Sequence, residues 1–99
     1  MPRYMGLHTF PKNAFSYEQI CQLSDAAQND RAVKGYRSFV NASEGRAVCI
    51  LDAPDKQSVV EWFKKMNLPT DAVIEVEVEG DCGRMKQLQA DPSIAAASA

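Results

Sequence analysis

The chain has 99 residues, 45% of them hydrophobic, and 11 basic against 13 acidic side chains give a formal net charge of −2. This length predicts one domain with one modest core. The lack of a basic surplus predicts no nucleic-acid partner. The absence of an apolar run near 18 residues or of a signal-peptide pattern predicts a cytoplasmic protein without a membrane partner.

The first part of the chain predicts a strand followed by a helix. Residues 3–10 are rich in β-forming side chains and end before a proline, which is typical of a strand. Ser16 is a natural N-cap, and Gln19 stands three residues later, as in a capping box. The apolar positions that follow, at helical spacing, are Ile20, Leu23 and Ala27. We therefore expect an amphipathic helix that buries one face.

Two β-rich segments, 32–41 and 47–53, come next and are separated by a short turn that contains Gly45. This spacing predicts a β-hairpin. The second segment reads AVCIL without any alternation, whereas a half-exposed strand alternates apolar and polar residues. We therefore expect this strand to be buried on both faces.

A second helix and a last strand complete the predicted domain. The helix begins at Pro54 or Asp55 and has Val59, Trp62, Phe63 and Met66 on its apolar side. Residues 71–80 alternate, with Ile74, Val76 and Val78 on one face and glutamates on the other. Residues 81–99 form a polar and then alanine-rich tail outside the fold, so we expect a domain at 1–80 and a C-terminal tail at 81–99.

The predicted order of elements is β-α-β-β-α-β, the split arrangement of a ferredoxin-like α+β fold. Right-handed crossovers place both helices on one face of a four-stranded antiparallel sheet, with the first and third strands in the centre. Met5 and Leu7 are expected to face the helices. Tyr4, His8 and Phe10 then lie on the open face, together with Tyr36 and either Ile50 or Leu51. An apolar face of this size predicts a homodimer of the dimeric α+β barrel type, with the two sheets stacked face to face.

The chain has three cysteines and one histidine, the residue types that most often bind transition metals. Cys21, Cys49 and Cys82 form no C-x-x-C pair, which argues against a structural zinc site and a disulfide framework. His8 and Cys49, with a carboxylate from Glu75 or Glu77, would supply the mixed ligand set that suits a transition metal. The alternatives are a histidine satisfied in the core or interface, a cysteine that acts as a small buried hydrophobe, and glutamates that form the solvated side of an edge strand.

No nucleophile elbow, glycine-rich phosphate loop or H-E-x-x-H motif occurs, so the sequence does not assign a reaction. A second hypothesis is an apolar ligand pocket between the sheet and the helices, where dimeric barrels hold small molecules. Its candidate lining residues are Tyr4, Phe10, Tyr36, Phe39 and Trp62. A third hypothesis is a non-catalytic interaction domain.

Three segments carry a family resemblance: MPRYMGLHTFP at the start, GRAVCILDAPD in the middle and DAVIEVEVEG at the end. Over residues 1–80 the chain resembles a family of small bacterial domains of unknown function, one branch of which is described as nickel-binding or nickel-responsive. The resemblance implies a ferredoxin-like dimer, nickel or another divalent transition metal as the ligand, and His8 and Cys49 as positions of interest. It also implies a His-x-x-x-His pair on the second helix, where this chain has Trp62 and Met66.

Overall fold

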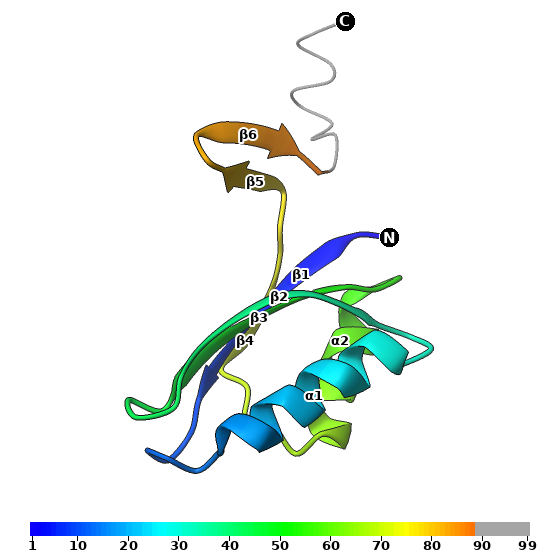
Figure 1. Cartoon of the computed structure of the whole chain (residues 1–99). Helices are drawn as coiled ribbons and strands as arrows, with labels where there is room; N and C mark the ends of the chain where they lie inside the picture. The colour runs from blue at the N-terminus through cyan, green and yellow to red at the C-terminus, as the bar shows by residue number, and fades with distance from the viewer. Residues whose placement is uncertain (89–99) are drawn as a thin grey trace, which may run out of the picture.

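The computed structural model describes residues 1–88, which form two helices and six strands (Figure 1). The elements in chain order are β1 (Arg3–Thr9), α1 (Tyr17–Asn29), β2 (Lys34–Asn41), β3 (Arg46–Asp52), α2 (Lys56–Lys65), β4 (Ala72–Glu75), β5 (Val78–Asp81) and β6 (Arg84–Gln87). No helix in this part of the chain has the length and apolar character needed to cross a membrane.

The first four strands form one antiparallel sheet in the order β2-β3-β1-β4, and both helices cover the same face of it (Figure 1). The strands β1 and β3 are therefore central, and β2 and β4 are the edges. This arrangement confirms the predicted ferredoxin-like α+β fold.

Both helices begin at polar N-caps that satisfy free backbone N–H groups. The hydroxyl of Ser16 accepts a hydrogen bond from the backbone of Gln19, and the Gln19 side chain accepts one from the backbone of Ser16, at 2.8 Å. The carboxylate of Asp55 accepts from the backbone of Ser58 at the start of α2. The predicted capping box and both predicted helices are thus confirmed.

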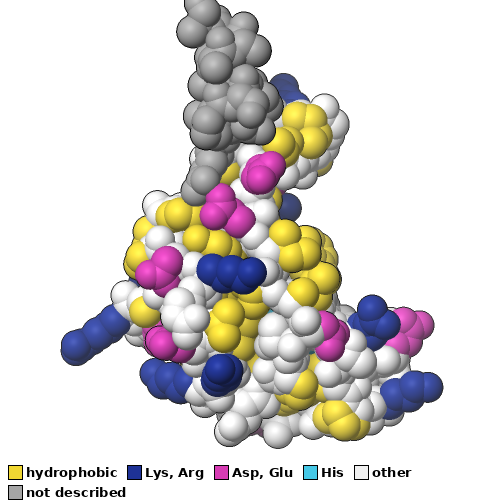
Figure 2. Space-filling model, turned by 180° about the vertical axis from the view of Figure 1, so that it is seen from behind, with side chains coloured by type: hydrophobic (Ala, Val, Ile, Leu, Met, Phe, Trp, Pro, Cys, Tyr) yellow, Lys and Arg dark blue, Asp and Glu magenta, His cyan; other side chains and the backbone are white. Residues whose placement is uncertain are grey.

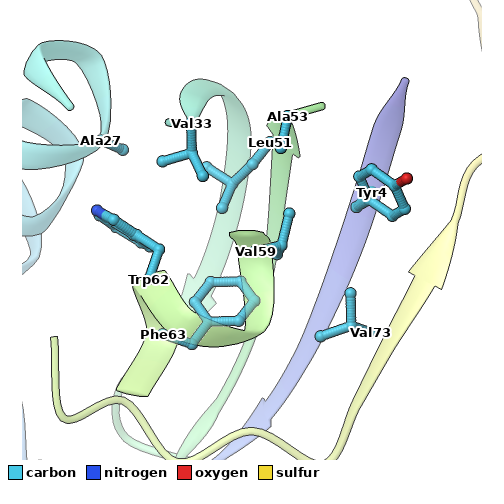
Figure 3. Close-up of a cluster of buried hydrophobic side chains, with 9 residues drawn as sticks. All are labelled: Tyr4, Ala27, Val33, Leu51, Ala53, Val59, Trp62, Phe63 and Val73. Carbon is cyan, nitrogen blue, oxygen red and sulfur yellow. The ribbon is translucent and has the colours of Figure 1, made fainter. Parts of the chain in front are cut away.

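The core lies between the sheet and the helices (Figure 3). From α2, Val59, Trp62 and Phe63 point toward the sheet, and Leu51 and Val73 point back from β3 and β4 (Figure 3). Val59 and Phe63 are almost fully buried. The α2 helix therefore supplies the centre of the core, as its apolar spacing predicts.

The predicted facing of β1 is wrong. Tyr4, His8 and Phe10 are buried on the helix side, whereas Met5 and Leu7 lie on the open face and are only half-buried. Both sides of this strand are apolar, so alternation alone did not indicate which side meets the helices. The large ring side chains fill the space between the two layers, and this decides the orientation.

The predicted last strand, 71–80, is also wrong in part. It is interrupted after Glu75, and Ile74 is 45% exposed on the open face while Val73 is buried beneath the helices. Residues 78–87 instead form the β5–β6 hairpin, which crosses the expected limit between domain and tail. Its turn residues Cys82 and Gly83 both have positive φ, 51° and 80°, as a type I′ hairpin turn requires. The remaining expected tail, residues 89–99, lies outside the described residues.

Candidate functional site

A cavity of about 240 Å³ lies on the helix side of the sheet, between α1 and the β2–β3 pair. The α1 wall includes Ile20, Leu23 and Ala27, and Cys49 and Leu51 of β3 lie in the opposite wall. Most of the lining surface is apolar, although polar side chains of α1 and β2 also line the cavity, which is partly open to solvent. The amphipathic face of α1 that the sequence predicts therefore forms one wall of a cavity.

Three of the five residues that the sequence predicts as pocket lining are among those that line this cavity: Phe10, Tyr36 and Trp62. Tyr4 belongs to the main core and does not line the cavity. Burial raises the pKa of the Tyr4 phenol, and the negative charges of Glu75 and Asp55 add to the effect. Tyr4 is thus a neutral core side chain that contacts the β4 edge.

Trp62 brings a polar group to this region of the core. It is 6% exposed, and its Nε1 has no hydrogen-bond partner within residues 1–88. In the close-up the indole nitrogen points away from Phe63 toward α1, on the side of Ala27 (Figure 3). A buried N–H without a partner costs free energy, so a hydrogen-bond acceptor placed next to this donor would offset that cost.

Cys49 lies on the helix side of β3, half-buried, and contributes to the cavity lining. Burial raises the pKa of its thiol to about 11. The thiolate is the form that binds metals and acts as a nucleophile, and near neutral pH this side chain is almost entirely the neutral thiol. Cys49 therefore behaves as a small apolar residue of the cavity wall.

His8 is 1% exposed, and the structure defines its tautomer. Its Nδ1 lies 2.9 Å from the carbonyl oxygen of Pro69, which can only accept a hydrogen bond. The hydroxyl of Thr70, 3.3 Å from the same nitrogen, donates to the carbonyl of Leu68. The proton is therefore on Nδ1, and Nε2 carries a free lone pair.

The Nε2 atom of His8 lies inside the protein and has no partner among the described residues. The imidazole packs edge-to-face on Phe63, with 4.6 Å between ring centroids. It also lies over Gly6, where an added Cβ would come within 2.9 Å of Nε2. Burial lowers the pKa of His8 below 6.5. The hydrogen bond to Pro69 and the charge of Asp71 both raise this pKa, but their effect is smaller than that of burial.

The metal ligands predicted from the sequence, His8, Cys49 and Glu75, all belong to strands of the main sheet, but the three together do not form a group that could hold a metal ion. Cys49 is paired with Gly6, whereas Glu75 is paired with Tyr4 at the exposed β4 edge. His8 lies four positions after Tyr4 on β1, about 13 Å along the strand. Within residues 1–88 no three histidine, cysteine or acidic side chains lie close enough to hold one metal ion.

The open face of the sheet carries a second group of apolar side chains, which we call the open-face patch. The strand register places them on the same side of neighbouring strands. Its members are Met5, Leu7, Phe39, Val48, Ile50 and Ile74. Phe39 is 60% exposed, and Figure 2 shows apolar surface on the body of the domain and on the hairpin above it. Phe39 therefore lies away from the cavity that the sequence associated it with.

Comparison with known proteins places this fold in a family. The family model described as nickel responsive protein SCO4226-like matches residues 4–76. The chain belongs to this SCO4226-like family. The resemblance seen in the sequence is therefore confirmed. The family description mentions nickel, but it does not assign a nickel ligand to this chain.

The fold of the SCO4226-like family is also seen in a solved structure. The crystal structure of SCO4226 from Streptomyces coelicolor A3(2) matches with a TM-score of 0.65 and 17% identity, over 79% of this chain and 99% of that chain. At this identity the match supports the shared fold alone. A search of curated proteins finds no match.

Proposed function

We propose that this chain is a dimeric ligand-binding domain that holds one small, mainly apolar organic molecule in the cavity beneath α1. The observation that carries the proposal is the cavity of about 240 Å³ between α1 and β2–β3. Its lining combines aliphatic and aromatic side chains with the unpaired indole N–H of Trp62 nearby. Ligand sites in proteins have this composition, mostly apolar with few polar groups.

The size of the cavity limits the ligand class. An apolar cavity of about 150 Å³ holds a molecule such as benzene, and pockets for larger ligands begin near 300 Å³. A volume of about 240 Å³ therefore fits a molecule with one substituted ring or a short branched chain. Apolar contact supplies most of the affinity in such a site.

Binding without catalysis is the activity that the side chains support. The thiol of Cys49 is held in its neutral form because burial raises its pKa to about 11. The free Nε2 of His8 is enclosed by Phe63 and Gly6 and does not line the cavity. Cys49 therefore meets a molecule beneath α1 as a neutral thiol, and His8 does not reach it.

Titration with ethylbenzene, followed by ¹H–¹⁵N NMR, tests the site. The chain has one tryptophan, so its indole N–H gives one signal that reports directly on the α1 side of the core. We expect saturable shifts of this signal and of α1 amides. The Ser24→Phe variant places a ring at a residue that lines the cavity and should weaken binding at least about tenfold.

The matched control is Gln22→Phe, which adds the same ring to an exposed position of α1 that does not line the cavity. We expect this variant to bind ethylbenzene as the original chain does. The absence of saturable shifts up to the solubility limit of ethylbenzene, or equal weakening by both variants, would contradict the proposal.

The proposed dimer joins two open-face patches. Each patch exposes six apolar side chains across four strands, with Phe39 and Ile74 the most exposed among them. At about 25 cal/mol per Å², burial of roughly 400 Å² of apolar surface per protomer would contribute on the order of 10 kcal/mol. This is enough to offset a large part of the cost of association.

Nickel binding is the second candidate, and membership of the SCO4226-like family is what favours it. The donor geometry of the described residues does not fit an ion held within one protomer, because His8, Cys49 and Glu75 are apart. Titration calorimetry of the untagged full chain with nickel chloride, compared with a His8→Asn variant, tests this. Loss of heat in the variant would assign His8 to a site, whereas equal heats would exclude it.

A further inference from the structure

The β5–β6 hairpin has one charged and one apolar side. Cross-strand pairs Glu79–Lys86 and Asp81–Arg84 bring opposite charges together on one side. Val78 and Met85 lie on the other side, 49% and 71% exposed, with the Met85 sulfur over Gly80. No described residue covers this apolar side, and a two-stranded hairpin alone in water is at best marginally stable.

The hairpin is attached to the open-face side of the main sheet. Arg3 of β1 forms an ion pair with Glu79 at 3.1 Å, and the hydroxyl of Tyr36 donates to the same carboxylate at 3.1 Å. The guanidinium of Arg3 also stacks on the Tyr36 ring, 3.6 Å from its centroid. These contacts fix the base of the hairpin. From there it stands above the sheet, on the side away from both helices (Figure 1).

The position of the hairpin relates it to the open-face patch. A second protomer stacked on that patch occupies the space beside the hairpin, because both are on the same side of the sheet. Apolar surface on the hairpin and apolar surface on the body of the domain are visible from the same side of the molecule (Figure 2). The hairpin also follows residues 4–76 and so lies outside the part of the chain that matches the family model.

We propose that the β5–β6 hairpin is a dimerisation arm, which packs its Val78–Met85 side against a second copy of this chain. The proposal rests on the face-to-face dimer proposed above and names a further contact within it. Each protomer contributes one arm, so the two-fold axis doubles every contact. Arm packing covers the exposed Met85 and supplies the tertiary support that the hairpin otherwise lacks.

The test compares two pairs of substitutions that leave the net charge unchanged. Val78→Thr with Met85→Gln removes the apolar side while it keeps a β-branched residue and a side chain of similar length. Asp81→Arg with Arg84→Asp exchanges the charges on the opposite side and keeps their pairing. By sedimentation equilibrium, we expect the first pair to weaken dimerisation at least about tenfold. The second pair should leave the dissociation constant within about twofold.

A direct measurement uses a mixed sample in which half of the chains carry ¹³C-labelled methionine methyl groups and the other half are unlabelled. We expect filtered intermolecular NOEs from the Met85 methyl group to the unlabelled protomer. Intramolecular NOEs from Met85 to residues 89–99, without intermolecular ones, would overturn the arm.

The outcomes separate the two proposals. A stable dimer that is unaffected by the Val78–Met85 pair and shows no intermolecular Met85 contacts overturns the arm and leaves the face-to-face dimer in place. A chain that remains a monomer at about 100 µM, well above the micromolar range of moderate affinities, overturns both.

Discussion

The side chain of His8 is fully buried, but within the described residues only one of its two ring nitrogens has a hydrogen-bond partner. Its Nδ1–H donates to Pro69, but its Nε2 has no partner in the described part of the chain. A protonated ring would need a second acceptor in a place that Phe63 and Gly6 occupy. The fold therefore holds His8 in its neutral form.

The stability of the fold should consequently fall in mild acid. Burial lowers the pKa of His8 below 6.5 in the folded chain. As the pH falls through 6.5, the unfolded chain takes up a proton that the folded chain does not, and the free energy of unfolding decreases. Between pH 7.5 and 5.5 we expect a loss of at most about 1.4 kcal/mol, measured by urea denaturation.

The control for this prediction is His8→Asn, which keeps an N–H donor near the Nδ1 position. Because His8 is the chain's one histidine, the variant should lose much less stability over the same pH interval, whatever its stability at pH 7.5. An equal pH dependence of the two proteins would show that His8 is not the responsible group.

At the scale of elements, the contact between α2 and β1 depends on the missing side chain of Gly6. An added Cβ would lie 2.5 Å from two ring atoms of Phe63, whose side chain is 1% exposed. The ring has little room to move because His8 and Trp62 also pack against it. The bare backbone at Gly6 is therefore what lets the α2 helix approach the central strand.

Gly6→Ala should destabilise the domain by about 1–3 kcal/mol, the usual cost of overpacking a core. Urea denaturation of the variant measures this cost. In a double-mutant cycle with Phe63→Leu, the smaller side chain should make room for the new methyl group, so the combined loss should be less than the sum of the two single losses. Additive losses, or an unaltered stability of Gly6→Ala, would disprove the close contact.

At the scale of the whole molecule, the proposed dimer predicts that stability depends on protein concentration. If folded chains associate and unfolded chains do not, the thermal midpoint rises with protein concentration. We expect this rise for the original chain and its loss in Phe39→Arg, which places a charge at the most exposed residue of the open-face patch. Calorimetry at protein concentrations that differ by a factor of about 100 measures it, since each tenfold change shifts the free energy by about 1.4 kcal/mol.

Tyr17→Arg provides the matched control for this prediction. Tyr17 is an aromatic residue on α1 that is 83% exposed and lies on the helix side of the molecule. Its replacement adds the same charge without touching the open-face patch, so the concentration dependence should persist. A thermal midpoint of the original chain that does not change with concentration would contradict the dimer.

Much of the fold follows from local signals in the sequence. The capping box at Ser16 and Gln19 defines the start of α1, and the apolar spacing of Val59 and Phe63 defines the buried side of α2. The number and order of the elements in the main sheet follow from these signals together with the hairpin around Gly45. Such features depend on neighbours within a few residues, and for this reason the sequence reveals them.

The sequence indicated only some of the residues that line the cavity. The aromatic residues Phe10, Tyr36 and Trp62 are part of the cavity lining that the structure shows. The α1 wall, with Leu23 and Ala27, was missed as lining, although the apolar stripe of this helix was visible. Residues from α1, β2 and β3 come together only when the layers pack, and local pattern does not report which side chains leave space between them.

What the sequence by itself determined is thus the set of main-sheet elements, the ferredoxin-like order and the family. The tertiary structure alone decided that Tyr4 and His8 face the helices, that the last predicted strand breaks after Glu75, and that His8, Cys49 and Glu75 stay apart. The physical reason is that both faces of β1 are apolar. The face that is buried depends on how the large side chains pack together in the space between the sheet and the helices.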